Sequence, residues 1–308
     1  MIPYLFFFAI QFILASVCQA NSFTLMTWNF QWLADHPKND IQRTAKDYQA
    51  LKQIFLTHQP DVLAFQEVNS AKSLYQVIPK DQYQVFMSSR TISEDDKFNG
   101  INQFTGFAVK KPIYAKQLND ISELSSPAAS LDLTSHYQQK LRYGAVISIK
   151  LDDNAITIAN LHLKSGCFYP KQLSNNKKKA CRTLNLQRKI VQQWVNNQQT
   201  KQVPFIVVGD FNHRIHQPPS INNGFISSPA NKPLKWLSQN INGNCLAKVT
   251  KNNRVYYRQY KQLIDHGFSS VHLILNSAQQ IQFAKHQVEQ YQLSDHCPLL
   301  FNLTLADT

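Results

Sequence analysis

The strongest structural signal in the sequence is Pro204-Phe-Ile-Val-Val-Gly-Asp-Phe-Asn-His-Arg214. An apolar run short enough to be one buried strand stops at a glycine, and a carboxylate (Asp210), an amide (Asn212) and two basic residues follow at once. Open α/β sheets place their functional sites at the carboxyl ends of strands, because the loops there converge on one crevice. The stretch therefore indicates either a site of this kind or an Asx-turn that closes a loop.

Other predicted strands also deliver polar side chains to their ends. Apolar patterns predict strands at 23–30, 62–67, 104–109, 143–151, 155–163, 263–268 and 299–305, and helical spacing predicts helices at 41–58 and 186–195. In two places a helix is followed by a strand and then an acid, which indicates two similar halves folded face to face. The polar residues at or beside the strand ends are Asn29, Glu67, Asn160, His162, Lys164, Asp210, Asn212, Asp265, Asp295 and His296.

The remaining stretches are predicted to be loops or exposed turns. Residues 88–102, 119–136 and 217–231 lack a periodic pattern and are predicted loops. Residues 165–182 are rich in lysine and would overhang a site at His162. Residues 248–261 interleave basic side chains with tyrosines, a composition that suits phosphate and base contacts as well as a plain exposed hairpin.

Residues 1–20 differ from the rest of the chain. They carry no charge, contain an apolar core and end in Ser-Val-Cys-Gln-Ala, which indicates an export signal cleaved after Ala20. A membrane anchor is the main alternative, but Gln11 interrupts an apolar run that is already shorter than a span requires. A lipoprotein signal cleaved before Cys18 is a weaker alternative. Residues 21–308 contain no linker or low-complexity segment and are predicted to form one secreted or periplasmic domain.

The charge and the cysteines agree with export. The net charge of +13 lies outside the signal and points to a polyanionic partner, which could be nucleic acid, an anionic lipid surface or a phosphorylated substrate. Four cysteines remain after the signal and allow three pairings. We expect Cys167–Cys181 with Cys245–Cys297, since closing the shorter loop would stabilise the fold by about 3 kcal/mol. Free thiols in the core are the alternative.

The residue types at the strand ends favour one kind of chemistry. Hard oxygen ligands, amides and two histidines suit metal-assisted hydrolysis of a phosphoester. The sequence contains no nucleophile elbow, no zinc motif and no phosphate-binding glycine loop, and its 8 glycines give little support to nucleotide-binding folds.

Six short segments in this order resemble the endonuclease/exonuclease/phosphatase superfamily: Thr-Trp-Asn29, Phe-Gln-Glu67-Val, Asn160-Leu-His162-Leu, Gly-Asp210-Phe-Asn212, Ile-Asp265-His and Ser-Asp295-His296-Cys-Pro. The resemblance implies a four-layer α/β sandwich, with two mixed β-sheets packed face to face and helices outside. It also implies a divalent metal, usually Mg²⁺ with Mn²⁺ or Ca²⁺ as alternatives, held chiefly by Glu67 with help from Asn29 and Asp295.

The resemblance also implies roles for the remaining residues in an in-line attack of water on phosphorus. His296, oriented by Asp265, would be the general base or a phosphate clamp. Asp210 and Asn212 would position the water and stabilise charge, and His162 would protonate or hydrogen-bond the leaving oxygen. The implied substrate contacts are Arg142, Asn160 and Lys164.

The segment Asn160-Leu-His162 is similar to the pancreatic-deoxyribonuclease branch, whereas the AP-endonuclease branch usually carries Asn-X-Tyr there. The signature of inositol-phosphate phosphatases is absent. We therefore expect a secreted, monomeric, sequence-nonspecific DNA endonuclease without stable membrane association. The alternatives are a sphingomyelinase-like phospholipid phosphodiesterase and a catalytically inactive nucleic-acid-binding module.

Overall fold

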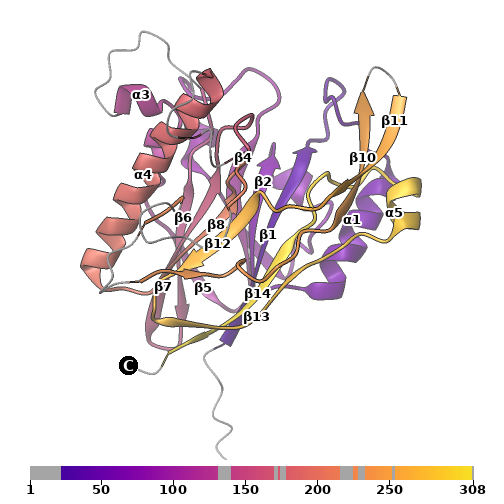
Figure 1. Cartoon of the computed structure of the whole chain (residues 1–308). Coiled ribbons are helices and arrows are strands. Elements are labelled where there is room, and N and C mark those ends of the chain that lie inside the picture. Colours follow the sequence, from indigo (N-terminus) through magenta and orange to yellow (C-terminus); the bar gives the residue numbers. More distant parts are fainter. Residues whose placement is uncertain are drawn as a thin grey trace, which may run out of the picture.

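The structure is a computed structural model that describes residues 22–130, 140–169, 173, 178–215, 225–227, 233–251 and 254–306. It contains two six-stranded mixed sheets (Figure 1). The first has the order β13 (Leu273–Gln280), β14 (Leu299–Leu305), β1 (Ser22–Leu33), β2 (Val62–Val68), β4 (Phe104–Lys110), β3 (Tyr83–Met87). The second has the order β5 (Tyr114–Gln117), β6 (Ala145–Leu151), β7 (Asn154–His162), β8 (Phe205–Asp210), β12 (Asp265–Ser269), β9 (Lys235–Trp236).

Helices cover the outer faces of both sheets. In Figure 1, α1 (Ala45–His58) and α5 (Lys285–Gln290) lie on one side and α4 (Lys179–Lys201) on the other. The short helical segments are α2 (Ala71–Leu74), α3 (Pro127–Ser130), η1 (Ser89–Ile92) and η2 (Ser122–Leu124). No helix in the described ranges is both long enough and apolar enough to cross a membrane.

Three apolar interfaces join the four layers. Strand β1 shows how one sequence serves two of them, because its side chains alternate between faces. Met26 and Trp28 pack towards α1, whereas Leu25 packs between the sheets. A third cluster joins the second sheet to α4. The predicted four-layer sandwich is confirmed.

Each sheet contains one β-α-β unit, as the sequence pattern of two similar halves predicted. Strands β1 and β2 are parallel and separated in the chain by α1, and β7 and β8 are parallel and separated by α4. Parallel neighbours end at the same edge of their sheet. This topology places Asn29 near Glu67 in the first sheet and His162 opposite Asp210 in the second.

Several predicted boundaries were wrong. Helix α1 begins at Ala45 rather than Ile41, because the Thr44 side chain caps the helix in a capping box with Asp47. Helix α4 begins at Lys179, so the last basic residues of the predicted loop 165–182 are helical. The predicted loops at 88–102 and 119–136 contain η1, η2 and α3. The export signal, Lys171, Lys177 and most of 217–231 lie outside the described residues.

Arg43 holds the end of β1 against the segment that leads to His296. Its guanidinium donates to the backbone oxygens of Phe30, Gln31 and Trp32 and, on the other side, to those of Gln292 and Leu293, at 2.8–3.2 Å. Burial lowers the pKa of Arg43 to about 10, so the group is still charged at neutral pH. One side chain therefore satisfies five carbonyls that belong to no regular ladder.

We expect Arg43→Ala to lower the free energy of unfolding by about 3 kcal/mol, because it leaves these carbonyls without their charged donor. Arg43→Lys should recover only part of the loss, since one ammonium cannot reach both segments. Urea unfolding measures the effect, with Lys46→Ala on the exposed side of α1 as the control. Equal stability of Arg43→Ala and Lys46→Ala would contradict the assigned role.

A separate two-stranded hairpin stands beside the sandwich. It consists of β10 (Cys245–Lys251) and β11 (Arg254–Tyr260) and projects from the body next to α1 and α5 (Figure 1). Its base is joined to the chain near His296 by the disulfide Cys245–Cys297. The second disulfide, Cys167–Cys181, joins the segment after β7 to the start of α4. Both predicted pairings are present.

Candidate active site

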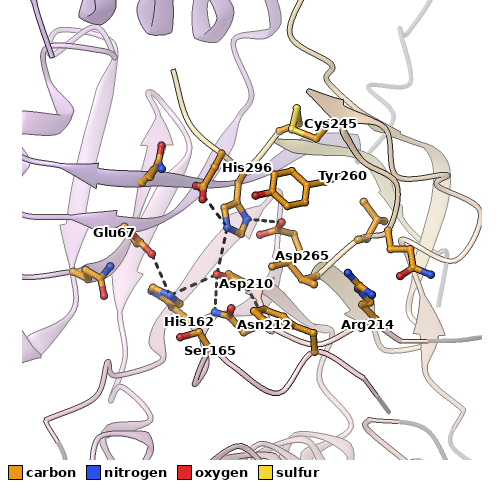
Figure 2. Close-up of a pocket in the computed structure, with 18 of the residues that line it drawn as sticks. Glu67, His162, Ser165, Asp210, Asn212, Arg214, Cys245, Tyr260, Asp265 and His296 are labelled. Atoms are coloured by element: carbon orange, nitrogen blue, oxygen red, sulfur yellow. Dashed lines mark hydrogen bonds and ion pairs between the residues drawn. A yellow bond between two sulfur atoms is a disulfide. The ribbon is translucent and has the colours of Figure 1, made fainter. Parts of the chain in front are cut away.

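A pocket of about 570 Å³ opens at the edge where β2, β7 and β8 end. Figure 2 shows polar side chains from both sheets pointing into it. The predicted site residues that line it are Glu67, Arg142, His162, Asp210, Asn212, Asp265, Asp295 and His296. Residues from six separate parts of the chain therefore converge on one cavity.

Glu67 is the next-to-last residue of β2 and has a left-handed backbone conformation, with φ of 58°. A residue with a Cβ is strained there, and strain of this kind gathers at functional sites. Its Oε2 accepts a hydrogen bond from the Trp32 backbone N at 3.0 Å, and its Oε1 accepts one from Asn29 Nδ2 at 3.2 Å. Burial, reinforced by the carboxylate of Asp295, raises the pKa of Glu67.

Asp210 follows a glycine that no other residue could replace without a shift of the backbone. A Cβ on Gly209 would lie 2.1 Å from the Leu161 backbone oxygen, and φ is +132°. Asp210 Oδ1 accepts from the Asn212 backbone N at 2.8 Å, which is an Asx-turn, while Oδ2 faces the pocket and accepts from Asn29 Nδ2 at 3.0 Å. The predicted Asx-turn is therefore present, and it leaves one oxygen of the same carboxylate facing the pocket. Burial raises the pKa of Asp210 to about 7.

His162 lies between the two carboxylates. Its Nε2 is 3.5 Å from Glu67 Oε1 and 3.5 Å from Asp210 Oδ2. Burial and the positive charge of Arg142 lower the pKa of His162 well below its ordinary value, so the ring is neutral. Its Nδ1 has no hydrogen-bond partner among the described residues.

His296 and Asp265 form a dyad on the other side of Asp210. His296 Nδ1 lies 2.8 Å from Asp265 Oδ2, and Nε2 is 3.9 Å from Asp210 Oδ2 (Figure 2). Burial alone would lower the pKa of His296, but the carboxylates of Asp265 and Asp210 outweigh it and raise the pKa well above its ordinary value. The imidazolium therefore persists at neutral pH with Nε2 facing the pocket.

The three predicted substrate contacts lie in different places. Arg142 lines the pocket and donates to the Leu163 backbone oxygen at 2.7 Å, while its buried Nε has no partner within the described chain. Lys164 is half-buried outside the pocket lining, with its Nζ near the Ser165 backbone oxygen. Asn160 is fully buried and does not reach the pocket.

Asn160 instead joins the two sheets below the site. Its Nδ2 donates to the backbone oxygens of Phe65 and Gly106, and its Oδ1 accepts from Gln66 Nε2 at 2.6 Å. These bonds occupy both the donors and the acceptor of the amide. The geometry therefore gives Asn160 a structural position, because a core residue of this kind cannot contact a substrate.

The sequence of residues 26–296 matches the model of the endonuclease/exonuclease/phosphatase family. The chain belongs to this family. No curated protein matches the sequence.

Solved structures of this fold are similar over almost the whole chain. A family protein from Bacteroides thetaiotaomicron is 17% identical with a TM-score of 0.60, and the match covers 94% of this chain and 100% of that one. D. rerio TDP2 in complex with a single-strand DNA product is 16% identical with a TM-score of 0.59, covering 92% and 99%. The human Nocturnin catalytic domain, with bound sulfate, is 18% identical with a TM-score of 0.55, covering 93% and 96%.

The donor set of this family member fits a hard divalent cation. The carboxylates of Glu67, which is largely buried, and of Asp210, which is fully buried, both have raised pKa values and both lie 3.5 Å from His162 Nε2. Carboxylates removed from water in this way are costly unless a cation pairs with them. The ligand atoms of Asp210, Asp265 and His296 also lie within 4.8 Å of one another. Since Asp265 and His296 are already hydrogen-bonded to each other, the carboxylate of Glu67 is the better anchor.

The predicted ligand Asn29 presents its amide nitrogen, not its oxygen, to the carboxylates. Nδ2 donates to both Glu67 and Asp210, while Oδ1 accepts from the Gln31 backbone N at 2.9 Å. The side chain is buried and does not line the pocket. In this geometry Asn29 sets the spacing of the two carboxylates.

Four further residues line the rim of the pocket, none of which was assigned a site role from the sequence. Arg214 lies over the ring of Tyr169 at 4.5 Å, and Arg258 lies over the ring of Tyr260 at 5.0 Å. The sequence does carry a signal for three of them. Arg214 closes the motif that begins at Pro204, and Arg258 and Tyr260 alternate on one face of a strand. The histidines His213 and His266 are buried and do not line the pocket.

Proposed function

We propose that the protein is a secreted, metal-dependent phosphodiesterase, and specifically a sequence-nonspecific DNA endonuclease of the pancreatic-deoxyribonuclease-like branch. The observation that carries this proposal is the pairing of charges in one pocket. Carboxylates suited to a cation, Glu67 and Asp295, line the same pocket as Arg142, whose buried Nε has no partner in the described structure. A phosphodiester held between a cation and a guanidinium is the ligand that such a pocket fits.

In this proposal Glu67 and Asp295 hold the divalent metal, with Mg²⁺ the first choice and Mn²⁺ or Ca²⁺ as alternatives. The bound metal would neutralise charge on the phosphate. Asn29 acts as a positioning residue, because its amide bonds to both Glu67 and Asp210. The assignment of Asp295 rests on its place in the pocket and on its field at Glu67.

The other side chains move the proton and bind the phosphate. Asp210, with a pKa of about 7, accepts the proton of the attacking water, and Asn212 holds that carboxylate through its backbone N. The imidazolium of His296, kept charged by Asp265, clamps a phosphate oxygen. His162 is neutral, so it donates a hydrogen bond to the leaving oxygen rather than a full proton.

Three observations support a nucleic acid substrate and a location in an oxidising compartment. The net charge of +13 suits a polyanion, and two disulfides suit a secreted or periplasmic protein. One structure of this fold, D. rerio TDP2, contains a single-strand DNA product. We infer one catalytic domain over residues 21–308 that acts as a monomer without stable membrane association, after removal of residues 1–20.

The test uses purified protein with supercoiled plasmid DNA, single-stranded DNA, RNA and sphingomyelin vesicles, each with Mg²⁺ and with a chelator. We expect nicking of the plasmid that requires the metal and does not depend on sequence. Cleavage of sphingomyelin with intact DNA would replace this proposal with the lipid phosphodiesterase. DNA binding without hydrolysis under every metal would indicate an inactive binding module.

A further inference from the structure

The hairpin β10–β11 buries few apolar side chains between its own strands, so contacts with the rest of the protein must hold it in place. A two-stranded hairpin is marginal in water unless something else holds it. Here the base is fixed by the Cys245–Cys297 disulfide, and Lys248 Nζ donates to the Glu289 backbone oxygen of α5 at 3.0 Å. Large side chains nevertheless stay in solvent near its outer end, where Val255 is 54% exposed. Exposed apolar and aromatic groups gathered in this way commonly mark a binding surface.

The two faces of the hairpin differ. Opposed residues share a face, and the pairs Cys245↔Tyr260, Ala247↔Arg258 and Val249↔Tyr256 alternate with the pairs of the other face. Cys245, Arg258 and Tyr260 line the pocket, so this is the face that continues from the active site. Figure 2 shows the Tyr260 ring beside His296 and Asp265.

On this pocket face β11 carries an alternation of cations and aromatic rings. Running outward from the pocket it presents Tyr260, Arg258, Tyr256 and Arg254. At about 3.3 Å per residue the row is roughly 20 Å long. That length matches at most about six nucleotides of a stacked strand at 3.4 Å each. Residues 245–260 include four basic residues and no acidic one, so the charge complements a phosphate backbone.

We infer that the row Arg254, Tyr256, Arg258 and Tyr260 binds the strand that leads away from the cleaved phosphodiester, with arginines on phosphates and tyrosines against bases. This inference rests on the proposed function, because it takes the pocket as the place of cleavage. A strand bound in this way is held without base-specific hydrogen bonds, since every base offers a π-face. The row therefore favours binding of a polynucleotide over a small phosphoester and does not discriminate between base sequences.

The neighbouring tyrosines provide a matched test. Tyr256 is 49% exposed on the pocket face and Tyr257 is 50% exposed on the opposite face, so the two substitutions remove equal exposed rings. Binding of a fluorescein-labelled 20-nucleotide single strand is measured by anisotropy with a chelator present, which prevents cleavage. We expect Tyr256→Ala to raise Kd about tenfold, as for the loss of one stacked base, and Tyr257→Ala to change it less than twofold. Arg254→Ala should reduce the slope of log affinity against log salt by about 0.7.

Equal effects of the two tyrosine variants, or no effect of Tyr256→Ala, would overturn the inference. So would release of the protein from sphingomyelin vesicles by Tyr257→Ala with strand affinity unchanged in Tyr256→Ala, since the hairpin would then be a lipid contact. Hydrolysis of bis(p-nitrophenyl) phosphate by the unmodified protein reports on the proposed function separately, because this diester is too small to extend from the pocket to Tyr256 and Arg254. Circular dichroism confirms that each variant is folded.

Discussion

Glu67→Gln should reduce turnover of DNA by at least about a thousandfold, equivalent to about 4 kcal/mol of transition-state stabilisation. The carboxylate is the anchor for the cation in the proposed site, and an amide of the same shape lacks its charge. The Trp32 backbone N would still find an oxygen acceptor in the glutamine, so the pocket should keep its form. Plasmid nicking with Mg²⁺ measures the loss.

The same variant should not destabilise the metal-free protein. Burial raises the pKa of Glu67, which means that the folded state disfavours its charged form. Above the ordinary pKa of a glutamate, a neutral side chain at this position removes that cost, so Tm should stay equal or rise. Glu94→Gln, at an exposed glutamate paired with Lys97, is the control for both measurements. A thousandfold loss accompanied by unfolding would mean that Glu67 is structural.

His296→Asn should reduce turnover by about 10²–10⁴-fold, because it removes the imidazolium that faces the phosphate. Asp265→Asn should cost less, since it acts only through the histidine. His286→Asn, at an exposed histidine of α5, should leave turnover unchanged. Activity equal to the unmodified protein in His296→Asn would exclude the ring from the reaction.

Asp265→Asn also has a signature that a merely structural change lacks. The Asp265 carboxylate raises the pKa of His296, so its removal must lower that pKa. If the charged ring is the active form, activity is lost as pH rises through the His296 pKa. The alkaline limb of the pH profile should therefore move to lower pH in Asp265→Asn, and an unmoved limb would contradict the clamp role.

Periodicity predicted most strands and placed polar residues at their ends, and the family resemblance implied the four-layer sandwich and the roles of the site residues. Strand ends are easy to predict because a buried apolar run must stop where the chain meets water, and parallel β-α-β units bring such ends together. Asn160 shows where this reasoning stops. Its strand position resembles that of His162, but burial between the sheets depends on Gln66 and Gly106, which are distant in sequence.

The hairpin row was only half predicted for a similar reason. Residues 248–261 carried the right composition, but a sequence does not say which face of a hairpin points to a pocket. That direction depends on Cys297 and on the register of Cys245 with Tyr260. The role of Arg43 could not be predicted either, because its five acceptors are backbone oxygens, and the sequence pattern does not show which backbone oxygens lack a partner.

The hydrogen bonds of the Asn29 amide couple the geometry of the site to the relative position of the two sheets. Asn29 and Glu67 belong to the first sheet and Asp210 to the second, so the bond from the Asn29 amide to Asp210 crosses the seam between the sheets, while its bond to Glu67 stays within the first sheet. The His162–Glu67 and His296–Asp265 contacts cross the same seam. A shift of one sheet relative to the other would therefore change the distances between the reactive side chains. The rigidity of the apolar layer between the sheets determines how precisely these side chains are aligned.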